Sequence, residues 1–343
     1  MDLLPQLAVG GLFGFVCLLV PVYCVRILLL TAWRRLAGRD LLRRRRLDRP
    51  VVRLLILSLG LIELCCFLYA WTVEPYRLEV TQETLRSDRL AAGATLRIVQ
   101  ISDLHIEADG QPVSGSGMAT GSAPGGSGEG KPGLADLVAA QAPDLVVLTG
   151  DYLNTDSPEA EAALRRLLGS LQPPYGTYAI LGNWDYRPWS RAGAILRESG
   201  VHVLAASSEE VDVRGTGVLL MNGQVPPEHP AHPPSDGQAG NEPGGRPIRI
   251  YLAHSPDSIE DVAGRVDLYF CGHTHGGQIR LPWFGAIVTL SRFWKRYEMG
   301  RYEVNGTTAF VNRGIGCEGG PVPRVRFLSP PEILVVDVAN SVP

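Results

Sequence analysis

The sequence has little net charge and few cysteines. Its 32 Lys and Arg residues nearly balance 35 Asp and Glu residues, which leaves a formal net charge of −3 at pH 7. Because that balance gives no strong positive field, we expect no nucleic-acid partner. Four of the six cysteines lie in two apolar N-terminal runs, a placement that does not indicate a disulfide framework. Cys271 and Cys317 fit no zinc motif and are either small buried residues or a disulfide pair.

Charge is also missing from two long stretches near the N-terminus. Residues 7–25 carry no charged side chain, and residues 54–71 carry only Glu63. Each stretch is long enough to cross the roughly 30 Å hydrocarbon core of a bilayer as a helix. A cleaved signal peptide is the alternative for the first stretch, but its basic start is missing, because Asp2 is the only early charge. We therefore predict two transmembrane helices.

The strongest charge cluster of the chain lies between these two stretches. Its members are Arg34, Arg35, Arg39, Arg43, Arg44, Arg45, Arg46, Arg49 and Arg53. Short loops rich in Arg face the cytoplasm by the positive-inside rule, although such a cluster also suits anionic lipid. We expect a plasma-membrane protein with two spans, a cytoplasmic Arg-rich loop and an extracytoplasmic C-terminal part. The predicted boundaries are residues 1–73 for the membrane anchor and residues 74–343 for the second domain.

The second domain alternates short apolar runs, typical of buried strands, with amphipathic segments typical of helices. The predicted strands are residues 95–102, 144–150, 175–182, 248–254, 266–272 and 332–338, and the predicted helices are residues 134–142, 157–171 and 191–200. This alternation predicts an α/β domain. Residues 109–133 are rich in Gly and Ser, and residues 226–247 are rich in Pro and Gly, so both are predicted to be flexible loops.

Side chains that can bind metal follow five of the predicted strands. They are Asp103 and His105, then Asp151, Asn183 and His254, and finally His273 and His275. Open α/β sheets place their sites at the carboxyl ends of strands. Each residue alone has an ordinary structural explanation, but five such strand ends together indicate a metal centre. On a stretch taken to be extended, His273 and His275 would point the same way.

Five short motifs contain these residues in a fixed order. They are "DLH" at 103–105, "GD" at 150–151, "GNWD" at 182–185, the lone His254 and "GHTH" at 272–275. In this order they resemble the motifs of the calcineurin-like metallophosphoesterases, and "GHTHGGQ" with a late "NRGIG" resembles the membrane-anchored YkuE-type subgroup. The resemblance covers roughly residues 72–338. It implies an α/β sandwich of two mixed β-sheets flanked by helices, with a dinuclear metal site at one edge.

The resemblance also implies a role for each residue. The expected ligands of the first metal ion are Asp103, His105 and His275, and those of the second are Asn183, His254 and His273. Asp151 resembles the carboxylate that bridges both ions, so catalysis is expected to centre on Asp151, Asn183 and His254. Mixed oxygen and nitrogen ligands suit two divalent ions such as Mn, Fe, Zn or Co, and paired ions of this kind clamp a phosphoryl group for hydrolysis.

One position departs from the family pattern. The family carries a His after the Asn of the third motif, thought to protonate the leaving group, and this chain carries Trp184 instead. An alkoxide leaving group needs that proton, whereas a phosphate leaving group does not, since its second pKa is about 6. Trp184 therefore favours a pyrophosphate substrate. Alternatively, Trp184 only packs the rim of the site, and water or another residue supplies the proton.

The expected substrate is a phosphorylated lipid or a lipid-linked sugar nucleotide such as UDP-2,3-diacylglucosamine. Arg313, Gln278 and Trp184 are expected to contact it. Residues 281–285 and 291–298 interleave aromatic and basic side chains, which suits either a lipid-facing lip or a packed loop. Sugar-nucleotide lipids are made in the cytoplasm, which conflicts with the extracytoplasmic placement. The alternative functions are a broad-specificity envelope phosphodiesterase or phosphatase and a non-catalytic metal-binding membrane scaffold.

Overall fold

The computed structural model describes residues 3–37, 50–90, 93–110, 133–223, 247–318 and 324–340. The two predicted flexible loops, residues 109–133 and 226–247, lie almost entirely outside the described residues, as does most of the Arg-rich segment.

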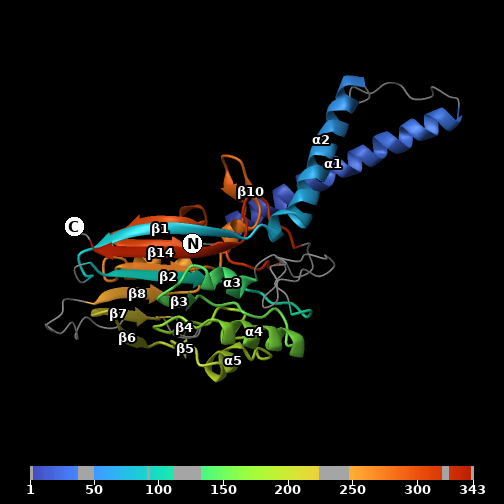
Figure 1. Ribbon diagram of the computed structural model, residues 1–343. Helices are drawn as coiled ribbons and strands as arrows, with labels where there is room; N and C mark the ends of the chain where they lie inside the picture. The colour runs from blue at the N-terminus through green and yellow to red at the C-terminus, as the bar shows by residue number, and fades with distance from the viewer. Residues whose placement is uncertain are drawn as a thin grey trace.

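Two long helices come first, and they project away from the rest of the chain (Figure 1). Helix α1 spans Leu4–Ala37 and helix α2 spans Pro50–Thr72. Both are long and apolar enough to cross a membrane, and little of either helix is buried against protein. They contact each other where Gly60 leaves room for Cys24, since a Cβ atom at residue 60 would lie 2.4 Å from the Cys24 sulfur. The two predicted transmembrane segments are therefore both helical candidate spans.

The remaining chain forms two six-stranded mixed sheets that face each other (Figure 1). The first sheet has the order β1-β14-β2-β3-β4-β5. Its strands are β1 (Glu79–Ser87), β2 (Thr95–Ile101), β3 (Leu145–Leu148), β4 (Thr177–Ala179), β5 (His202–Val203) and β14 (Glu332–Asn340). Strands β2 to β5 are parallel, and β14 runs antiparallel to β2.

The second sheet has the order β12-β13-β9-β8-β7-β6. Its strands are β6 (Ser208–Val213), β7 (Thr216–Met221), β8 (Ile248–Leu252), β9 (Leu268–Cys271), β12 (Gly300–Val304) and β13 (Thr307–Val311). A small hairpin of β10 (Arg280–Leu281) and β11 (Gly285–Ala286) stands apart from both sheets. All six predicted strands form, and the predicted two-sheet sandwich is confirmed.

The apolar side chains form three layers that explain this architecture. One cluster fills the space between the two sheets and includes Ile98, Val147, Ile250 and Phe270. A second cluster joins the outer face of the first sheet to helices α3 (Leu134–Ala139), α4 (Pro158–Ser170) and α5 (Ala192–Glu198). A third lies on the outer face of the second sheet, beside α6 (Ile259–Val262). The central strands are buried on both faces, which is why they are near-continuous apolar runs.

Local signals in the sequence explain where the predicted helices begin. The Ser157 hydroxyl accepts a hydrogen bond from the Ala160 N–H at 3.1 Å, and Pro158 occupies the first helical position of α4.

Cys271 and Cys317 are both buried and free, so they are small core residues and not a disulfide pair.

Each of the two long helices is attached to the two-sheet domain at one of its ends. At the start of α1, the Gln6 amide donates to the Ser291 carbonyl at 2.6 Å and accepts from the Thr289 N–H at 3.0 Å. At the end of α2, the Ala70 carbonyl accepts from the Arg326 N–H at 2.9 Å. The far ends of both helices therefore lie away from the domain (Figure 1).

Candidate metal centre

The predicted metal-binding residues occupy loops that follow strands of both sheets at the same edge. Five of the seven have positive φ angles: Asp103, His105, Asp151, His273 and His275. The left-handed region costs roughly 1–3 kcal/mol for a residue with a side chain, and such strain collects at functional sites. The packing is also close, because a Cβ atom at Gly272 would lie 2.1 Å from an Asp103 carboxylate oxygen. The local sequence thus holds these side chains in a geometry that ordinary turns do not require.

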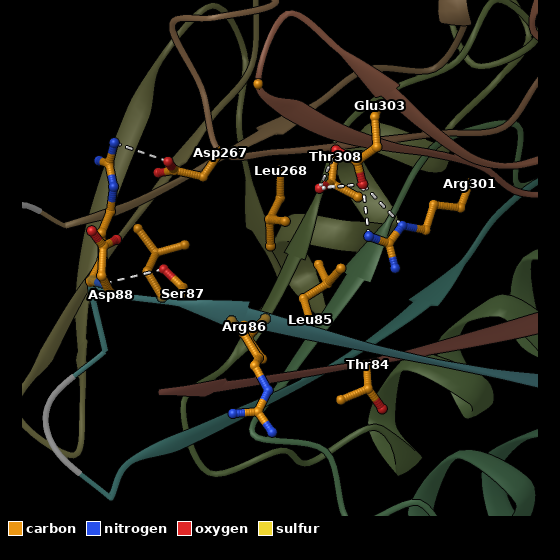
Figure 2. Close-up of a pocket in the computed structure, with 14 residues that line it drawn as sticks. Thr84, Leu85, Arg86, Ser87, Asp88, Asp267, Leu268, Arg301, Glu303 and Thr308 are labelled. Atoms are coloured by element: carbon orange, nitrogen blue, oxygen red, sulfur yellow. Dashed lines mark hydrogen bonds and ion pairs between the residues drawn. The ribbon is translucent and has the colours of Figure 1, made fainter. Parts of the chain in front are cut away.

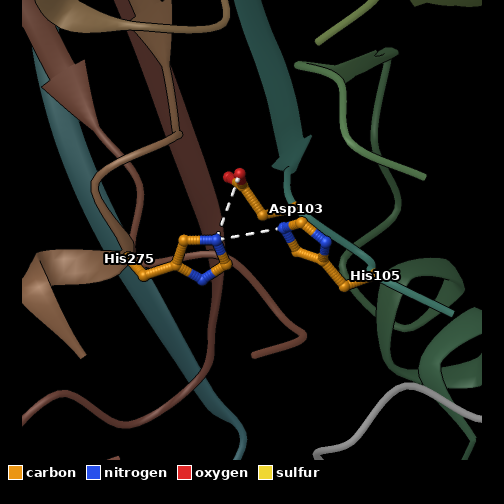
Figure 3. A group of neighbouring side chains, drawn as sticks. All are labelled: Asp103, His105 and His275. Carbon is orange, nitrogen blue, oxygen red and sulfur yellow. Dashed lines mark hydrogen bonds and ion pairs between the residues drawn. The ribbon is translucent and has the colours of Figure 1, made fainter. Parts of the chain in front are cut away.

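The structure brings Asp103, His105 and His275 together as one group (Figure 3). His105 Nε2 and His275 Nε2 lie 3.2 Å apart, and His275 Nε2 lies 3.5 Å from Asp103 Oδ1. All three residues are buried, with at most 2% of their surface exposed. The first group is therefore enclosed by protein.

Asp151, His254 and His273 form a second group. His254 Nε2 lies 3.2 Å from His273 Nδ1 and 3.2 Å from Asp151 Oδ2. Asn183 is exposed, and its side-chain oxygen lies 3.0 Å from His254 Nε2. This second group is consequently the side of the centre that a dissolved molecule can reach.

Asp151 lies between the two groups. Its Oδ2 atom is 3.2 Å from His254 Nε2 in the second group and 3.7 Å from His105 Nε2 in the first group. Its other oxygen, Oδ1, accepts a hydrogen bond from the Trp184 N–H at 2.8 Å, which fixes the carboxylate plane. One carboxylate oxygen thus faces both groups at once.

The expectation that His273 and His275 lie on an extended stretch is wrong. Both residues have positive φ angles, and a short 3₁₀ turn covers His275–Gly277. The chain turns sharply after β9 because the two glycines that follow His275 also adopt positive φ angles. It is this turn, and not a period of two, that delivers the two imidazoles to different groups.

Two hydrogen bonds orient the imidazoles of the centre. His254 Nδ1 lies 2.8 Å from the Thr149 carbonyl, and His105 Nδ1 lies 2.6 Å from the Asn154 side-chain oxygen. In each case the Nδ1–H donates to an oxygen, so Nε2 is the ring nitrogen that faces the centre. Asn154 was not predicted from the sequence, and no motif pointed to it.

Asp185 supports the loops beneath Asp151. Its carboxylate accepts hydrogen bonds from three backbone N–H groups, those of Gly182, Asp151 and Tyr152, at 2.7 to 3.0 Å. Burial and the charge of Asp151 raise the pKa of Asp185 to about 7, although the three N–H donors oppose that rise. Asp185 is the last residue of the predicted "GNWD" motif, so the sequence marked its position but not its role.

Arg326 is a second support that the sequence did not reveal. It is fully buried and donates to the carbonyls of Gly314 and Ser329 at 3.1 and 3.0 Å. Its guanidinium also lies 3.2 Å from His275 Nδ1. The Arg326 backbone N–H donates a hydrogen bond to the Ala70 carbonyl at the end of α2. Arg326 therefore links the end of the second helix to the first group.

The electrostatics of the centre favour a bound cation. Burial alone would raise the pKa of Asp151, but the charges of His254 and His105 outweigh it and lower the pKa to about 2. Burial lowers the pKa of His254, and Asp151 reverses this and raises it to about 10. Burial lowers the pKa of His273 and, together with the charges of His105 and Arg326, lowers that of His275 far below its usual range. Both of these imidazoles are therefore neutral, the form that binds metal.

The donor set fits divalent metal ions. Two pairs of imidazole nitrogens face each other at 3.2 Å, an approach that needs a proton or a cation between them. Two carboxylates, those of Asp103 and Asp151, are buried beside these nitrogens. Buried carboxylates and neutral imidazoles at such spacing are typical of centres that hold first-row divalent metals.

Trp184 lies at the rim of the centre. Its indole ring meets the His105 ring edge-on, with centroids 5.6 Å apart, and its Nε1–H donates to the Glu318 carboxylate at 3.1 Å. Gln278 holds the Glu318 backbone through two hydrogen bonds, of 2.8 and 2.6 Å. Gln278 thus supports the rim through Glu318, a residue that the sequence did not single out.

Arg313 does not present a free charge to the centre. Its guanidinium lies 3.2 Å from Glu79 and 3.1 Å from Glu332, both on the first sheet. Arg280, the other arginine near the turn, pairs with Glu298 at 2.9 Å. The contact predicted between Arg313 and the substrate stays a prediction, and it would require this arginine to leave two carboxylates.

A separate cavity of about 580 Å³ lies at the opposite end of the sheets, between β1 and the β12–β13 hairpin (Figure 2). Four of its charged groups form two ion pairs within the lining. Arg301 pairs with Glu303 at 2.7 Å, and Arg89 pairs with Asp267 at 3.0 Å. We therefore assign no ligand to this cavity.

Comparison with known proteins agrees with the geometry. The family profile described as calcineurin-like phosphoesterase matches residues 96–277. The uncharacterized metallophosphoesterase YkuE of Bacillus subtilis is 30% identical over 292 residues, which cover 80% of this chain and 90% of that protein. Phosphodiesterase YaeI of Escherichia coli is 32% identical over 60% of this chain and 75% of its own length. UDP-2,3-diacylglucosamine pyrophosphatase LpxG of Chlamydia muridarum is 27% identical over 79% of this chain and 92% of its own length.

Proposed function

Because the chain belongs to the calcineurin-like phosphoesterases, hydrolases that act on phosphoester bonds, we propose that it is a membrane-anchored enzyme with two divalent metal ions. Its substrate is a lipid-linked molecule that is hydrolysed at a phosphoester or pyrophosphate bond. The observation that carries this proposal is the position of Asp151, whose Oδ2 atom faces both groups of candidate metal-binding side chains.

In this proposal each group holds one ion. Asp103, His105 and His275 hold the first, Asn183, His254 and His273 hold the second, and Asp151 is shared. When bound, the ions supply Lewis-acid polarisation of a phosphoryl group, and Mn, Fe, Zn or Co would suit the mixed ligands. Asp151, Asn183 and His254 line the accessible side of the centre, so they position the phosphoryl group. The buried first group excludes water from the opposite side.

The proposed anchor comprises residues 1–73, and the proposed catalytic domain comprises residues 74–343. The start of α1 and the end of α2 both contact the domain. If both helices cross the membrane, the segment between them lies on the side opposite the domain. Its arginines favour the cytoplasm, so we place the catalytic domain outside the cytoplasm.

Two observations favour a lipid-linked pyrophosphate as the substrate. Trp184 occupies the position of the usual acid, and a phosphate leaving group does not need one. Arg326 contacts both His275 of the centre and the end of α2. The centre therefore lies close to the end of a candidate span, within reach of a substrate held in the membrane. The name of the Chlamydia muridarum relative, a UDP-2,3-diacylglucosamine pyrophosphatase, supports this class. A broad phosphodiesterase is the second candidate, supported by the name of the Escherichia coli relative.

Hydrolysis of bis-p-nitrophenyl phosphate tests the proposed activity. The full chain in detergent should release p-nitrophenolate, lose the activity after chelation and regain it when Mn, Fe, Zn or Co is added. A rate that survives complete removal of metal would refute the proposal.

A further inference from the structure

The β10–β11 hairpin carries the most exposed aromatic side chain described in the chain. Trp283, at its tip, has an exposed fraction of 104%, and the neighbouring Phe284 is 43% exposed. A tryptophan fully exposed to water is unusual, because its large apolar ring gains free energy from burial. Trp283 also has a positive φ angle of 63°, so the turn itself projects the ring outward.

The hairpin is built onto the segment that joins the second helix to the metal centre. Its first strand is fixed by the Arg280 N–H, which donates to the Phe327 carbonyl at 2.9 Å. The Phe327 ring meets the Tyr69 ring of α2 edge-on, with centroids 6.2 Å apart. Tyr69 and the exposed Trp71 lie in the last turn of α2, where aromatic side chains mark a membrane interface. The root of the hairpin is therefore level with the end of a candidate span.

The start of the first helix lies on the same side. Gln6 of α1 binds residues 289–291, which follow the hairpin along the chain. Leu290 in that segment is 41% exposed, as is Leu328 at 44% beside Phe327. Figure 1 shows the hairpin rising from the sheets on the side from which α1 and α2 project. Trp283, Phe284, Leu290 and Leu328, which we call the apolar lip, thus adjoin both candidate spans.

The basic side chains near the apolar lip are already paired. Arg280 and Lys295 bind Glu298 at 2.9 and 2.6 Å, Arg292 binds Asp261 at 2.8 Å, and Arg296 binds Glu260. The Lys295 ammonium also lies 4.1 Å from the centre of the Phe284 ring. These pairs leave little net charge, so the surface suits an apolar phase more than a polyanion. By contrast, Phe293 and Tyr297 of residues 291–298 pack on the core and are not part of the lip.

We propose that the apolar lip inserts into the interfacial region of the bilayer beside the anchor and holds the metal centre at the membrane surface. The inference rests on the membrane anchoring in the proposed function, and it names the lipid surface as the partner of the hairpin. The hairpin follows the His275–Gly277 turn directly, so its depth sets the distance between lipid and the centre. A substrate whose acyl chains stay in the bilayer would then present its phosphate to the Asn183 side.

Quenching of tryptophan fluorescence by brominated lipid tests the lip. The full chain is reconstituted in phosphatidylcholine vesicles whose acyl chains are either normal or brominated, and wild type is compared with Trp283→Phe. The difference between the two spectra isolates the Trp283 emission. It should be blue-shifted and should lose most of its intensity in brominated lipid. High salt should not restore it, because the neighbouring charges are paired.

The matched control is Trp189→Phe, since Trp189 packs on the core beside α5 and its difference spectrum should not respond to bromine. A Trp283 emission that is not blue-shifted and is the same in both lipids would place the hairpin in water and overturn the proposal. A blue-shifted emission that is the same in both lipids would mean that protein covers the hairpin, and would also overturn it. Hydrolysis of bis-p-nitrophenyl phosphate by the same vesicles separates the two proposals. Quenching without hydrolysis would refute only the enzymatic function, and hydrolysis without quenching would refute only the lip.

Discussion

Replacing Trp184 by His tests whether the missing acid selects the substrate. Position 184 faces the centre, because the indole ring lies edge-on to His105 and its backbone N–H binds Asp151. In wild type, pyrophosphate bonds and aryl phosphodiesters should react much faster than alkyl phosphodiesters, whose leaving groups need a proton. A well-placed general acid raises the rate by about 100- to 10,000-fold. We expect a smaller gain here, because the surrounding residues do not hold the introduced imidazole in an optimal position. The Trp184→His variant should therefore improve the alkyl-to-aryl rate ratio by at least about tenfold.

Trp184→Phe is the matched control for packing. Phe keeps a ring against His105 but loses the Nε1–H that donates to Glu318, and it supplies no acid. A hydrogen bond to a charged acceptor contributes roughly 1.5–3 kcal/mol when buried, and for this half-buried pair we expect about 1 kcal/mol. Both variants lose this bond, so both should show a similar fall in thermal stability. Only the His variant should change the preference among leaving groups.

The assay is a series of aryl and alkyl phosphodiesters, measured as kcat/KM for wild type and both variants. KM is expected to rise for every substrate, because each substitution opens space where an indole stood. The quantity to compare is thus the ratio between leaving groups. If wild type shows no dependence on the leaving group, and the His variant leaves the ratio unchanged, Trp184 is only a packing residue. The physical argument for a pyrophosphate substrate would then be lost.

Three further outcomes follow from the same account. Asp185→Asn should lower the free energy of unfolding by about 3 kcal/mol in chemical denaturation, because one amide oxygen cannot serve three buried N–H donors, and unchanged stability would contradict that role. Replacing residues 110–131 by a short Gly/Ser linker should leave the thermal stability and metal content unchanged, since the segment cannot bury much apolar surface, and a large loss of stability would show that it packs. An alkaline phosphatase fused after Pro343 should be active, because the proposed topology places it outside the cytoplasm. A fluorescent protein fused at the same position that is active in the cytoplasm would reverse that topology. It would also favour cytoplasmic sugar nucleotides as substrates.

The sequence predicted the interior of the sandwich better than its edges. Strands such as β2, β3 and β9 are buried on both faces, so their apolar runs are conspicuous. The edge strand β1 was missed because it is mostly polar, "EVTQETLRS", and only Leu85 in it is buried. An edge strand is defined by a partner distant in the chain, here β14, and local composition does not contain that information.

The candidate centre also contains some residues that the sequence reveals and others that only the structure reveals. The seven candidate ligands could be named from the sequence because each belongs to a short motif at a strand end, and their role as metal ligands stays a prediction. Asn154 and Arg326 could not, since they reach His105 and His275 only through the folded arrangement of loops. The direction of a side chain was also beyond the sequence. The Arg313 guanidinium binds Glu79 and Glu332 on the first sheet, which no local motif indicated, and its predicted contact with the substrate stays a prediction.

Metal content and activity of the Asp151→Asn variant test the central claim most directly. The wild-type chain, loaded with Mn, Fe, Zn or Co and freed of excess metal, should contain two ions per chain by elemental analysis. Asn can still accept the hydrogen bond from the Trp184 N–H, so circular dichroism of the variant should match wild type. The account predicts that this folded variant loses hydrolysis of bis-p-nitrophenyl phosphate and holds fewer than two ions. Two ions and substantial activity in the variant would remove Asp151 from the centre of the mechanism.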